Sequence, residues 1–321
     1  MSVLVSMGGV VGEWCEEDSN TKPGVITIPP LDRGLLYGHA LFETILVNGG
    51  RLILPRAHLD RLLENAPRLG FSVPWSVEQL LFEMENLVAL RSIPLGYLRI
   101  LITAGSGEGL WPGEQHQSQP QKIFYYGARD EDASMSPKLA KSQRIQPGQE
   151  ESGGLKLRRK IAYHYSHEPR IKTNSYFHEI VALKQATQEG FHDILWTRED
   201  GEILEASTAN IFFMARHGDL LEVATPPLSS GILPGITRKK VIELLQHAGI
   251  PVTEQKIYFD EMPRFDEGFL TSSIAGLRPL GQIDRQRLHT LRPQASFWHF
   301  QRLYQTWLET HQNETSMVQN S

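Results

Sequence analysis

Three segments in the second half of the chain decide its fold: IKTNSY at 171–176, GEILEASTANIF at 201–212 and LPGITR at 233–238. In that order they offer a lysine amine, a glutamate carboxylate and the amides at the start of a predicted helix. An amine can bind an aldehyde covalently, a carboxylate can keep a ring nitrogen protonated, and a helix start attracts phosphate. These are the three groups that pyridoxal phosphate requires from a protein.

The order and spacing of these segments resemble the fold-type-IV pyridoxal-phosphate enzymes, over roughly residues 30 to 285. That family holds the branched-chain and D-amino-acid aminotransferases and aminodeoxychorismate lyase. The resemblance implies an α+β, two-lobed fold like that of D-amino-acid aminotransferase. A small N-terminal α/β lobe and a larger C-terminal lobe would hold pyridoxal 5'-phosphate between them. The resemblance also implies a homodimer, because sites of the family take residues from both subunits.

The composition excludes several classes of protein. A chain of 321 residues with 40% hydrophobic and 21% charged residues is typical of a soluble globular protein. The net charge of −5 gives no electrostatic basis for binding nucleic acid or an anionic membrane. Cys15 is the only cysteine, and His164 and His167 have no third ligand near them in sequence, so we expect no metal site. Without a secretory signal or a membrane-spanning run, a cytoplasmic enzyme with a small-molecule amino substrate is the default.

Hydrophobic periodicity predicts the secondary structure. Apolar residues at helical spacing predict helices at 57–69, 77–90, 176–189, 237–248 and 291–308. Short apolar runs between turn residues predict strands at 24–28, 41–47, 51–54, 97–103, 122–126, 193–197, 203–205 and 268–271. The polar, proline- and glycine-rich stretch 127–155 marks a boundary. We therefore predict a small lobe at 1–140, a connection at 141–155, a large lobe at 156–290 and a helical appendage at 291–321.

Lys172 is the predicted catalytic residue. A lysine taken alone is usually a solvated surface residue. The family's Schiff-base lysine, however, precedes a helix with two alanines at the spacing of Ala182 and Ala186. EASTANIF at 205–212 resembles the family's Glu-x-Ser-x-x-Asn-Ile/Leu-Phe pattern, so Glu205 would bind the pyridine nitrogen rather than lie exposed at a strand end. Asn210 would brace this loop, either for the cofactor or for the structure alone.

Three segments are predicted to bind the phosphate. Ile236 and Thr237 begin a helix after Gly235, so their amides can face an anion, although the same residues could form an ordinary helix cap. HLDRL at 58–62 resembles the family's His-x-x-Arg-Leu, which makes Arg61 a phosphate ligand in place of a solvated charge. TSSI at 271–274 aligns with the family's third phosphate loop and offers Ser272 and Ser273; the alternative is a serine-rich surface turn.

Further residues are predicted around the cofactor and substrate. Tyr176 lies one turn after Lys172, one residue closer than the tyrosine that bonds the cofactor's ring oxygen in branched-chain aminotransferases. RGLLYG at 33–38 and FET at 42–44 resemble the family's substrate entrance, which makes Tyr37 a substrate-binding candidate. His39 and Ala40 depart from the usual Asp-Gly there. Arg99 could bind a substrate carboxylate, although an arginine on a strand is often paired or exposed.

The motifs leave more than one reaction open. SSIAGLRPL at 272–280 is similar to the lyase pattern Asn-Ser-Leu-x-Gly-x-Arg-Pro-Val, and 97–107 resembles a second lyase segment. Ala104 replaces the arginine with which D-amino-acid aminotransferases bind carboxylate, whereas Ser272 replaces the lyase asparagine. We expect a 4-amino-4-deoxychorismate lyase of folate synthesis. The alternatives are a branched-chain-type aminotransferase that uses 2-oxoglutarate and a non-catalytic binding protein.

Overall fold

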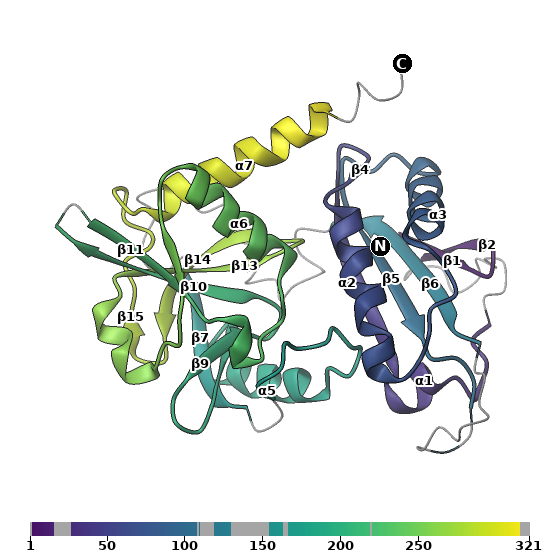
Figure 1. Cartoon of the computed structure of the whole chain (residues 1–321), viewed down its shortest axis with the longest axis horizontal. Helices are drawn as coiled ribbons and strands as arrows, with labels where there is room; N and C mark the ends of the chain where they lie inside the picture. The colour runs from purple at the N-terminus through teal and green to yellow at the C-terminus, as the bar shows by residue number, and fades with distance from the viewer. Residues whose placement is uncertain are drawn as a thin grey trace. The chain divides into compact units, whose positions relative to one another are not determined.

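The structure is a computed structural model of the chain that describes residues 2–15, 27–107, 109, 119–129, 154–162, 166–218 and 220–314. The described residues form two compact units, whose elements are labelled in Figure 1. The first unit holds the described residues up to 129 together with Ile171–Tyr176; the second holds those from 154 to Arg170 and from Phe177 onward. The predicted boundary between residues 140 and 141 lies outside the described residues. The sequence did not predict that Lys172 would belong to the first unit.

The first unit is built on an antiparallel sheet. Among the described residues its strand order is β2-β1-β6-β5-β3-β4. The strands are β1 (Ser2–Met7), β2 (Val10–Cys15), β3 (Ala40–Asn48), β4 (Arg51–Leu52), β5 (Leu95–Thr103) and β6 (Gln121–Ala128). The long strands β3 and β5 pair from Ala40↔Thr103 to Asn48↔Leu95. Because side chains alternate along a strand, Phe42 and Glu43 point to opposite faces of this sheet.

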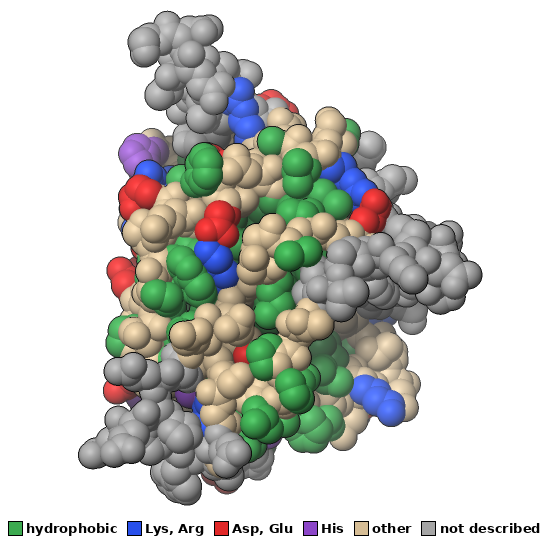
Figure 2. Space-filling view, turned by 90° about the vertical axis from the view of Figure 1, so that its right-hand side faces the viewer, with side chains coloured by type: hydrophobic (Ala, Val, Ile, Leu, Met, Phe, Trp, Pro, Cys, Tyr) green, Lys and Arg blue, Asp and Glu red, His purple; other side chains and the backbone are tan. Residues whose placement is uncertain are grey.

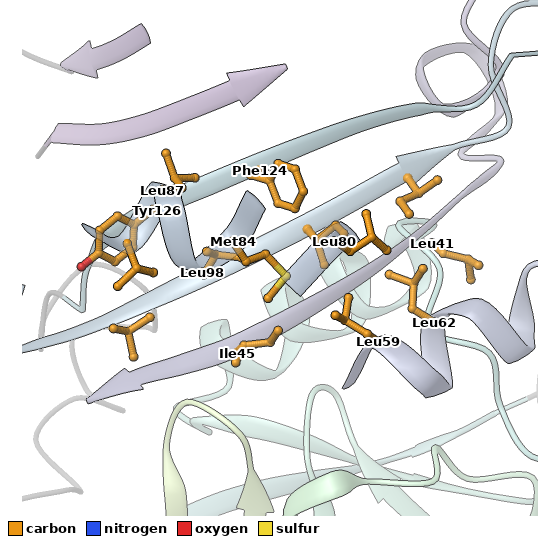
Figure 3. Close-up of a cluster of buried hydrophobic side chains, with 14 of the residues drawn as sticks. Leu41, Ile45, Leu59, Leu62, Leu80, Met84, Leu87, Leu98, Phe124 and Tyr126 are labelled. Atoms are coloured by element: carbon orange, nitrogen blue, oxygen red, sulfur yellow. The ribbon is translucent and has the colours of Figure 1, made fainter. Parts of the chain in front are cut away.

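Helices cover one face of that sheet. They are α2 (Pro55–Asn65), the 3-10 turn η1 (Pro67–Leu69) and α3 (Val77–Ala89), whereas α1 (Arg33–Tyr37) lies against the Thr103 side chain at the end of β5. Pro55 fits the first turn of α2, whereas Pro67 has no amide to continue it, so the predicted helix 57–69 is divided. Ser76 and Gln79 form a capping box that starts α3. Figure 3 shows the resulting core, in which Leu41 of β3 faces Leu59 and Leu62 of α2.

The second unit is a mixed sheet with helices. Its described strands run in the order β12-β11-β10-β13-β14-β7-β8-β9, and β15 pairs with β14. Three pairs are parallel, namely β11 with β12, β14 with β7 and β7 with β8. The strands are β7 (Leu155–Ile161), β8 (Asp193–Thr197), β9 (Ile203–Ala206), β10 (Asn210–His217), β11 (Leu220–Thr225), β12 (Val252–Glu254), β13 (Glu267–Ser272), β14 (Gly276–Ile283) and β15 (Gln286–Arg287). The helices are α5 (Phe177–Gln188), α6 (Ile236–His247), α7 (Phe297–Glu314) and the 3-10 turns η4 (Leu228–Ser230) and η5 (Phe259–Arg264).

The last helix begins where a distant strand caps it. The Glu267 carboxylate of β13 accepts hydrogen bonds from the amides of Ser296 and Phe297, at 2.9 and 3.0 Å. A carboxylate at a helix start satisfies amides that have no partner within the helix. The helix therefore starts at Phe297 and not at 291 as predicted. Its buried aromatic residues include Phe297 and Phe300, whose rings pack around Phe269.

Most predicted elements are confirmed, with two corrections at the N-terminus. The hairpin of β3 and β4, the helices α2, α3, α5 and α6, and strands β5, β6, β8, β9 and β13 lie where the sequence placed them, within a few residues. The strand predicted at 24–28 is wrong for Thr27 and Ile28, which are irregular; residues 24–26 lie outside the described part. Residues 2–15, for which no element was predicted, form the hairpin of β1 and β2. No helix of the described residues has the length and apolarity to cross a membrane.

Candidate active site

Lys172 lies beside β3, the strand that carries the FET motif. Its carbonyl accepts the Phe42 amide at 3.1 Å, and Thr173 forms an antiparallel bridge with Leu41. The Lys172 Nζ lies 4.4 Å from the centre of the Phe42 ring, within the range of a cation–π contact. Lys172 is thus attached by its backbone to β3, which fixes where its side chain starts.

Phe42 brings three predicted residues together. Besides Lys172, the Arg99 guanidinium lies 4.8 Å from its ring centre, and the Tyr176 ring lies 5.7 Å away. Arg99 is exposed and donates from Nε to the Thr44 hydroxyl at 3.2 Å. Phe42 itself is buried. Sequence reasoning quoted Phe42 only as part of a motif and gave it no role, although it joins the catalytic, cofactor and substrate candidates of the first unit.

Arg61 is oriented by a buried glutamate. Glu43 points from β3 toward α2 and accepts the Arg61 Nε at 2.8 Å and a terminal nitrogen at 2.7 Å. His58 Nδ1 lies 2.7 Å from the same carboxylate. Burial would raise the Glu43 pKa, but Arg61 and His58 outweigh it and lower that pKa to about 2. Glu43 thus fixes the guanidinium geometry, and the role of Arg61 as a phosphate ligand stays a prediction.

Burial favours the neutral form of His58 by lowering its pKa. Burial is the largest cause that lowers its pKa from 6.5, and Glu43 only partly offsets it. A neutral imidazole next to an ionised carboxylate must donate the proton of the bond, so we assign the proton to Nδ1. The His58 of the HLDRL motif therefore supports Glu43, which in turn supports Arg61.

Glu205 is held by donors from separate segments of the second unit. Its Oε2 accepts the side-chain amide of Asn210 at 3.0 Å and the backbone amide of Leu233 at 3.1 Å. Its Oε1 accepts Arg170 at 3.3 Å. Glu205 is 3% exposed on β9, so its position is set by these bonds and by packing. Glu205 is therefore a buried, oriented carboxylate and not an exposed glutamate at a strand end. Its bond to the ring nitrogen of the cofactor stays a prediction.

Asn210 organises the predicted phosphate segments. Besides Glu205 it donates to the Leu233 carbonyl at 3.0 Å, and in the sheet its register partner is Thr271. Gly235 caps α6 without a side-chain hydrogen bond, and a Cβ placed on it would lie 2.0 Å from the Asn210 oxygen. Asn210 therefore has a structural role, one of the two that the sequence left open. The start of α6, at Gly235, and the start of the Thr271–Ile274 turn both lie next to Asn210.

The remaining phosphate candidates lie at the starts of these elements. Ile236 and Thr237 form the first turn of α6, and Thr237 is buried. Ser272 ends β13, and its hydroxyl accepts the Ala275 amide at 3.4 Å, so it helps to close the turn. Ser273 follows in that turn. Asn210 thus lies next to Glu205, Gly235 and Thr271, and the roles of the helix-start and turn residues as phosphate ligands stay predictions.

Replacing Gly235 by alanine should weaken cofactor binding. The new methyl group would collide with the Asn210 oxygen, and Asn210 is held by Glu205 and Leu233. We expect a loss of about 1–3 kcal/mol in stability and a dissociation constant for pyridoxal phosphate at least about tenfold higher. The measurements are a urea titration and equilibrium dialysis. In Gly249→Ala the methyl group meets nothing within 4 Å, so its φ of 75° makes it a control for backbone strain alone. Equal dialysis results for the two variants would contradict the prediction.

At the predicted substrate entrance, His39 stands where the family pattern has an aspartate, and its contacts hold the surrounding structure together. His39 bonds the Leu69 carbonyl at 2.7 Å through Nε2, accepts from Arg33 through Nδ1 and packs edge-on against Phe71. Tyr37 ends α1, is 39% exposed and packs under the Arg33 guanidinium at 5.3 Å. Its substrate-binding role stays a prediction.

The arginine of the lyase-like segment is part of the core. Arg278 on β14 is 1% exposed, and its guanidinium lies 4.0 Å from the Asp193 carboxylate on β8. Burial raises the Asp193 pKa, while Arg278 and hydrogen bonds from Ser207 oppose that rise. Ser207 follows Glu205 by two residues. Arg278 thus supports the loop behind Glu205 through Asp193.

The donor groups fit pyridoxal phosphate. Two buried polar atoms next to predicted ligands, the Thr271 hydroxyl and the Asn174 side-chain oxygen, have no hydrogen-bond partner among the described residues. Buried polar atoms are normally satisfied, so such atoms mark places where a bound group contributes. The α6 start without a side-chain cap suits a phosphate. No group of three or more potential metal ligands occurs in the described part of the chain.

Comparison with known proteins identifies the family. A model of the family described as amino-transferase class IV matches residues 40–283, more than half of the chain. The chain belongs to the class IV aminotransferases. Members of this family depend on pyridoxal phosphate, and the chain is a pyridoxal-phosphate-dependent enzyme of the α+β, fold-type-IV class.

Relatives within the class IV aminotransferases carry different activities. A putative branched-chain-amino-acid aminotransferase of Methanocaldococcus jannaschii is 28% identical, with 79% of this chain and 81% of the relative covered. The aminodeoxychorismate lyase of Bacillus subtilis is 25% identical, with 86% of each covered. A solved pyridoxal-phosphate-bound hypothetical aminotransferase of Mycobacterium tuberculosis shares the fold with a TM-score of 0.73 at 19% identity; 94% of this chain and 97% of that one are covered.

Proposed function

We propose that this class IV enzyme is a 4-amino-4-deoxychorismate lyase, which releases pyruvate and leaves 4-aminobenzoate for folate synthesis. The observation that carries the proposal is the segment 272–280. It has the lyase-like Gly-x-Arg-Pro order, and its arginine is accommodated by Asp193. The aminotransferase branch instead has a threonine before the proline. The relative from Bacillus subtilis, aligned over 277 residues, adds support.

Ala104 argues against a D-amino-acid aminotransferase. D-Amino-acid aminotransferases bind the substrate carboxylate with an arginine at the matching position. Ala104 is 1% exposed and belongs to the hydrophobic core of the first unit. A guanidinium at this position would have to be buried in that core, which is costly unless it is paired. Arg99, exposed next to Phe42, offers a cation for a substrate carboxylate instead.

The residues divide the work of the proposed reaction. Bound pyridoxal phosphate supplies the electron sink for the carbon that carries the substrate amine. Lys172 would take the proton from that carbon while the C–O bond between the ring and the three-carbon side chain breaks. The side chain leaves as the enolate of pyruvate, which takes up a proton to become pyruvate. Glu205 keeps the cofactor's ring nitrogen protonated. Arg99 binds a carboxylate of the substrate and so orients the carbon toward Lys172.

An aminotransferase acting on branched-chain amino acids is the second candidate. Tyr176 favours it, because its ring packs against Phe42 beside Lys172, where a phenol could bond the cofactor's ring oxygen. The relative from Methanocaldococcus jannaschii also points to this branch. A non-catalytic binding protein is the remaining alternative, and the presence of Lys172, Glu205 and Arg61 together argues against it.

One pair of assays separates these reactions. With 4-amino-4-deoxychorismate, we expect continuous pyruvate release, coupled to lactate dehydrogenase, and fluorescence of 4-aminobenzoate without any amino acceptor. With leucine or glutamate, we expect the visible band of the enzyme to persist. Bleaching of that band by leucine, reversed by 2-oxoglutarate, together with no pyruvate in the first assay, would establish the aminotransferase. Arg99→Leu should raise KM at least about tenfold in whichever assay is active, because a charged hydrogen bond to the substrate is lost.

We also propose that the enzyme is a cytoplasmic homodimer. Apolar side chains are exposed in both units, including Leu35 at 62% and Phe177 at 71%. Figure 2 shows apolar side chains interspersed with charged ones on one face of the molecule. Exposed apolar surface is typical of faces that a second subunit covers. Light scattering of the purified protein tests the subunit number, and a monomeric mass at micromolar concentration would contradict it.

A further inference from the structure

Arg170 lies between two buried carboxylates. One terminal nitrogen donates to Glu205 Oε1 at 3.3 Å, and the other donates to Glu179 Oε1. The Glu179 and Glu205 side chains are 1% and 4% exposed, and that of Arg170 is 23% exposed. One guanidinium thus pairs with a residue of β9 and with a residue of α5.

The backbone of Arg170 is anchored by a hydrogen bond. The Arg170 amide donates to the Ile232 carbonyl at 3.1 Å. Leu233, which follows Ile232 in the sequence, donates its own amide to Glu205. A flexible arginine would contribute little to the orientation of a carboxylate. Because the Arg170 backbone is anchored next to Leu233, its side chain reaches the Glu205 carboxylate from a fixed point.

The negative charges of Glu179 and Glu205 also require a positive charge between them, which Arg170 supplies. Two carboxylates that share one guanidinium lie close enough to repel each other, and like charges in a buried site force one of them to take a proton. A protonated Glu205 could not hold a proton on a pyridine nitrogen. The Arg170 guanidinium places a positive charge between the two carboxylates.

We propose that Arg170 is a positioning residue that offsets the charge of Glu179, so that Glu205 stays ionised and aimed at the ring nitrogen of pyridoxal phosphate. Arg170 does not touch the reacting atoms in this role; it acts through Glu205. The inference rests on the predicted role of Glu205 and on the cofactor of the family, and it holds for a lyase and for an aminotransferase alike.

The test compares Arg170→Met with the double variant Arg170→Met/Glu179→Gln. In the single variant, we expect the dissociation constant of pyridoxal phosphate to rise at least about tenfold. The pH midpoint of the bound cofactor's visible absorbance should move upward, because a ring nitrogen that loses its proton withdraws electrons less. The double variant removes the second carboxylate as well as the cation, so its midpoint should return toward that of the unchanged enzyme. Arg170→Lys, which keeps the charge, should shift the midpoint less than Arg170→Met.

Arg158→Met is the matched control. Arg158 on β7 also contacts two carboxylates, Glu189 at 2.7 Å and Asp284 at 3.1 Å, but has no contact with Glu205 among the described bonds. It should leave both the dissociation constant and the midpoint unchanged. The proposal is overturned if Arg170→Met leaves both unchanged, if Arg158→Met has the same effect, or if the double variant is as impaired as the single one. Each readout uses bound cofactor without substrate, so failure of the pyruvate assay does not affect this test.

Discussion

Replacement of Lys172 by alanine is expected to abolish the visible absorbance band of the bound cofactor and to lower turnover at least about a thousandfold. The amine is both the point of covalent attachment and the base that moves the substrate proton. Its side chain starts from a backbone that is hydrogen-bonded to Phe42 of β3, which fixes its position. Absorbance spectra and peptide mapping after borohydride reduction measure the attachment, and steady-state assays measure turnover.

Lys122 provides the control for Lys172. Its Nζ lies 4.4 Å from the Trp75 ring, the same cation–π distance as between Lys172 and Phe42, and it belongs to the same unit. Lys122→Ala should keep the visible band and most of the activity. A borohydride-labelled peptide that contains a lysine other than Lys172 would refute the assignment, and with it the proposed reactions.

The second large effect is expected from Glu43→Gln. The substitution leaves the buried Arg61 guanidinium without its paired carboxylate, and breaking a buried ion pair in this way costs about 3–5 kcal/mol. We expect the midpoint of urea denaturation to fall accordingly, and cofactor binding to weaken because Arg61 loses its orientation. Glu78→Gln removes the carboxylate of an exposed pair with Arg56, in which the Arg56 and Glu78 side chains are 61% and 69% exposed, so it should leave the urea midpoint nearly unchanged.

The contribution of Glu43 should also depend on pH in a definite direction. Its pKa in the folded protein is about 2, below the ordinary value of 4.5, so the unfolded chain binds the proton more readily. The stabilisation is fully present above pH 4.5 and is lost as the pH falls toward 2. The difference in unfolding free energy between the unchanged protein and Glu43→Gln should therefore shrink across that window. A difference that stays constant from pH 6 to pH 3 would show that Glu43 acts without its charge.

Strongly periodic elements could be predicted from the sequence. Helices α2, α3 and α6 carry apolar stripes that bury one face, and the hairpin of β3 and β4 has a glycine turn between apolar runs. The hairpin of β1 and β2 has the same signal in Gly8 and Gly9, both with positive φ, but short apolar runs near a terminus suggested no partner. The start of α7 could not be found, because the cap comes from Glu267, 30 residues away in sequence from Phe297.

The candidate site likewise contains some residues that could be predicted from the sequence and others that could not. Motif residues such as Lys172 and Glu205 could be assigned because their spacing resembles that of a known family. Arg170 and Glu179 could not, because a pair between a loop and a helix leaves no periodic trace. One signal was present: Glu179 falls on the stripe of α5 that buries Ala182 and Ala186, and a charge on a buried stripe requires a partner.

The buried pair of Arg278 and Asp193 bears on how relatives of this enzyme are sorted. An arginine enclosed in the sheet needs its aspartate, so evolutionary change at either position should be accompanied by change at the other. Grouping homologues by the arginine of this segment should then also group them by the aspartate that faces it across the sheet.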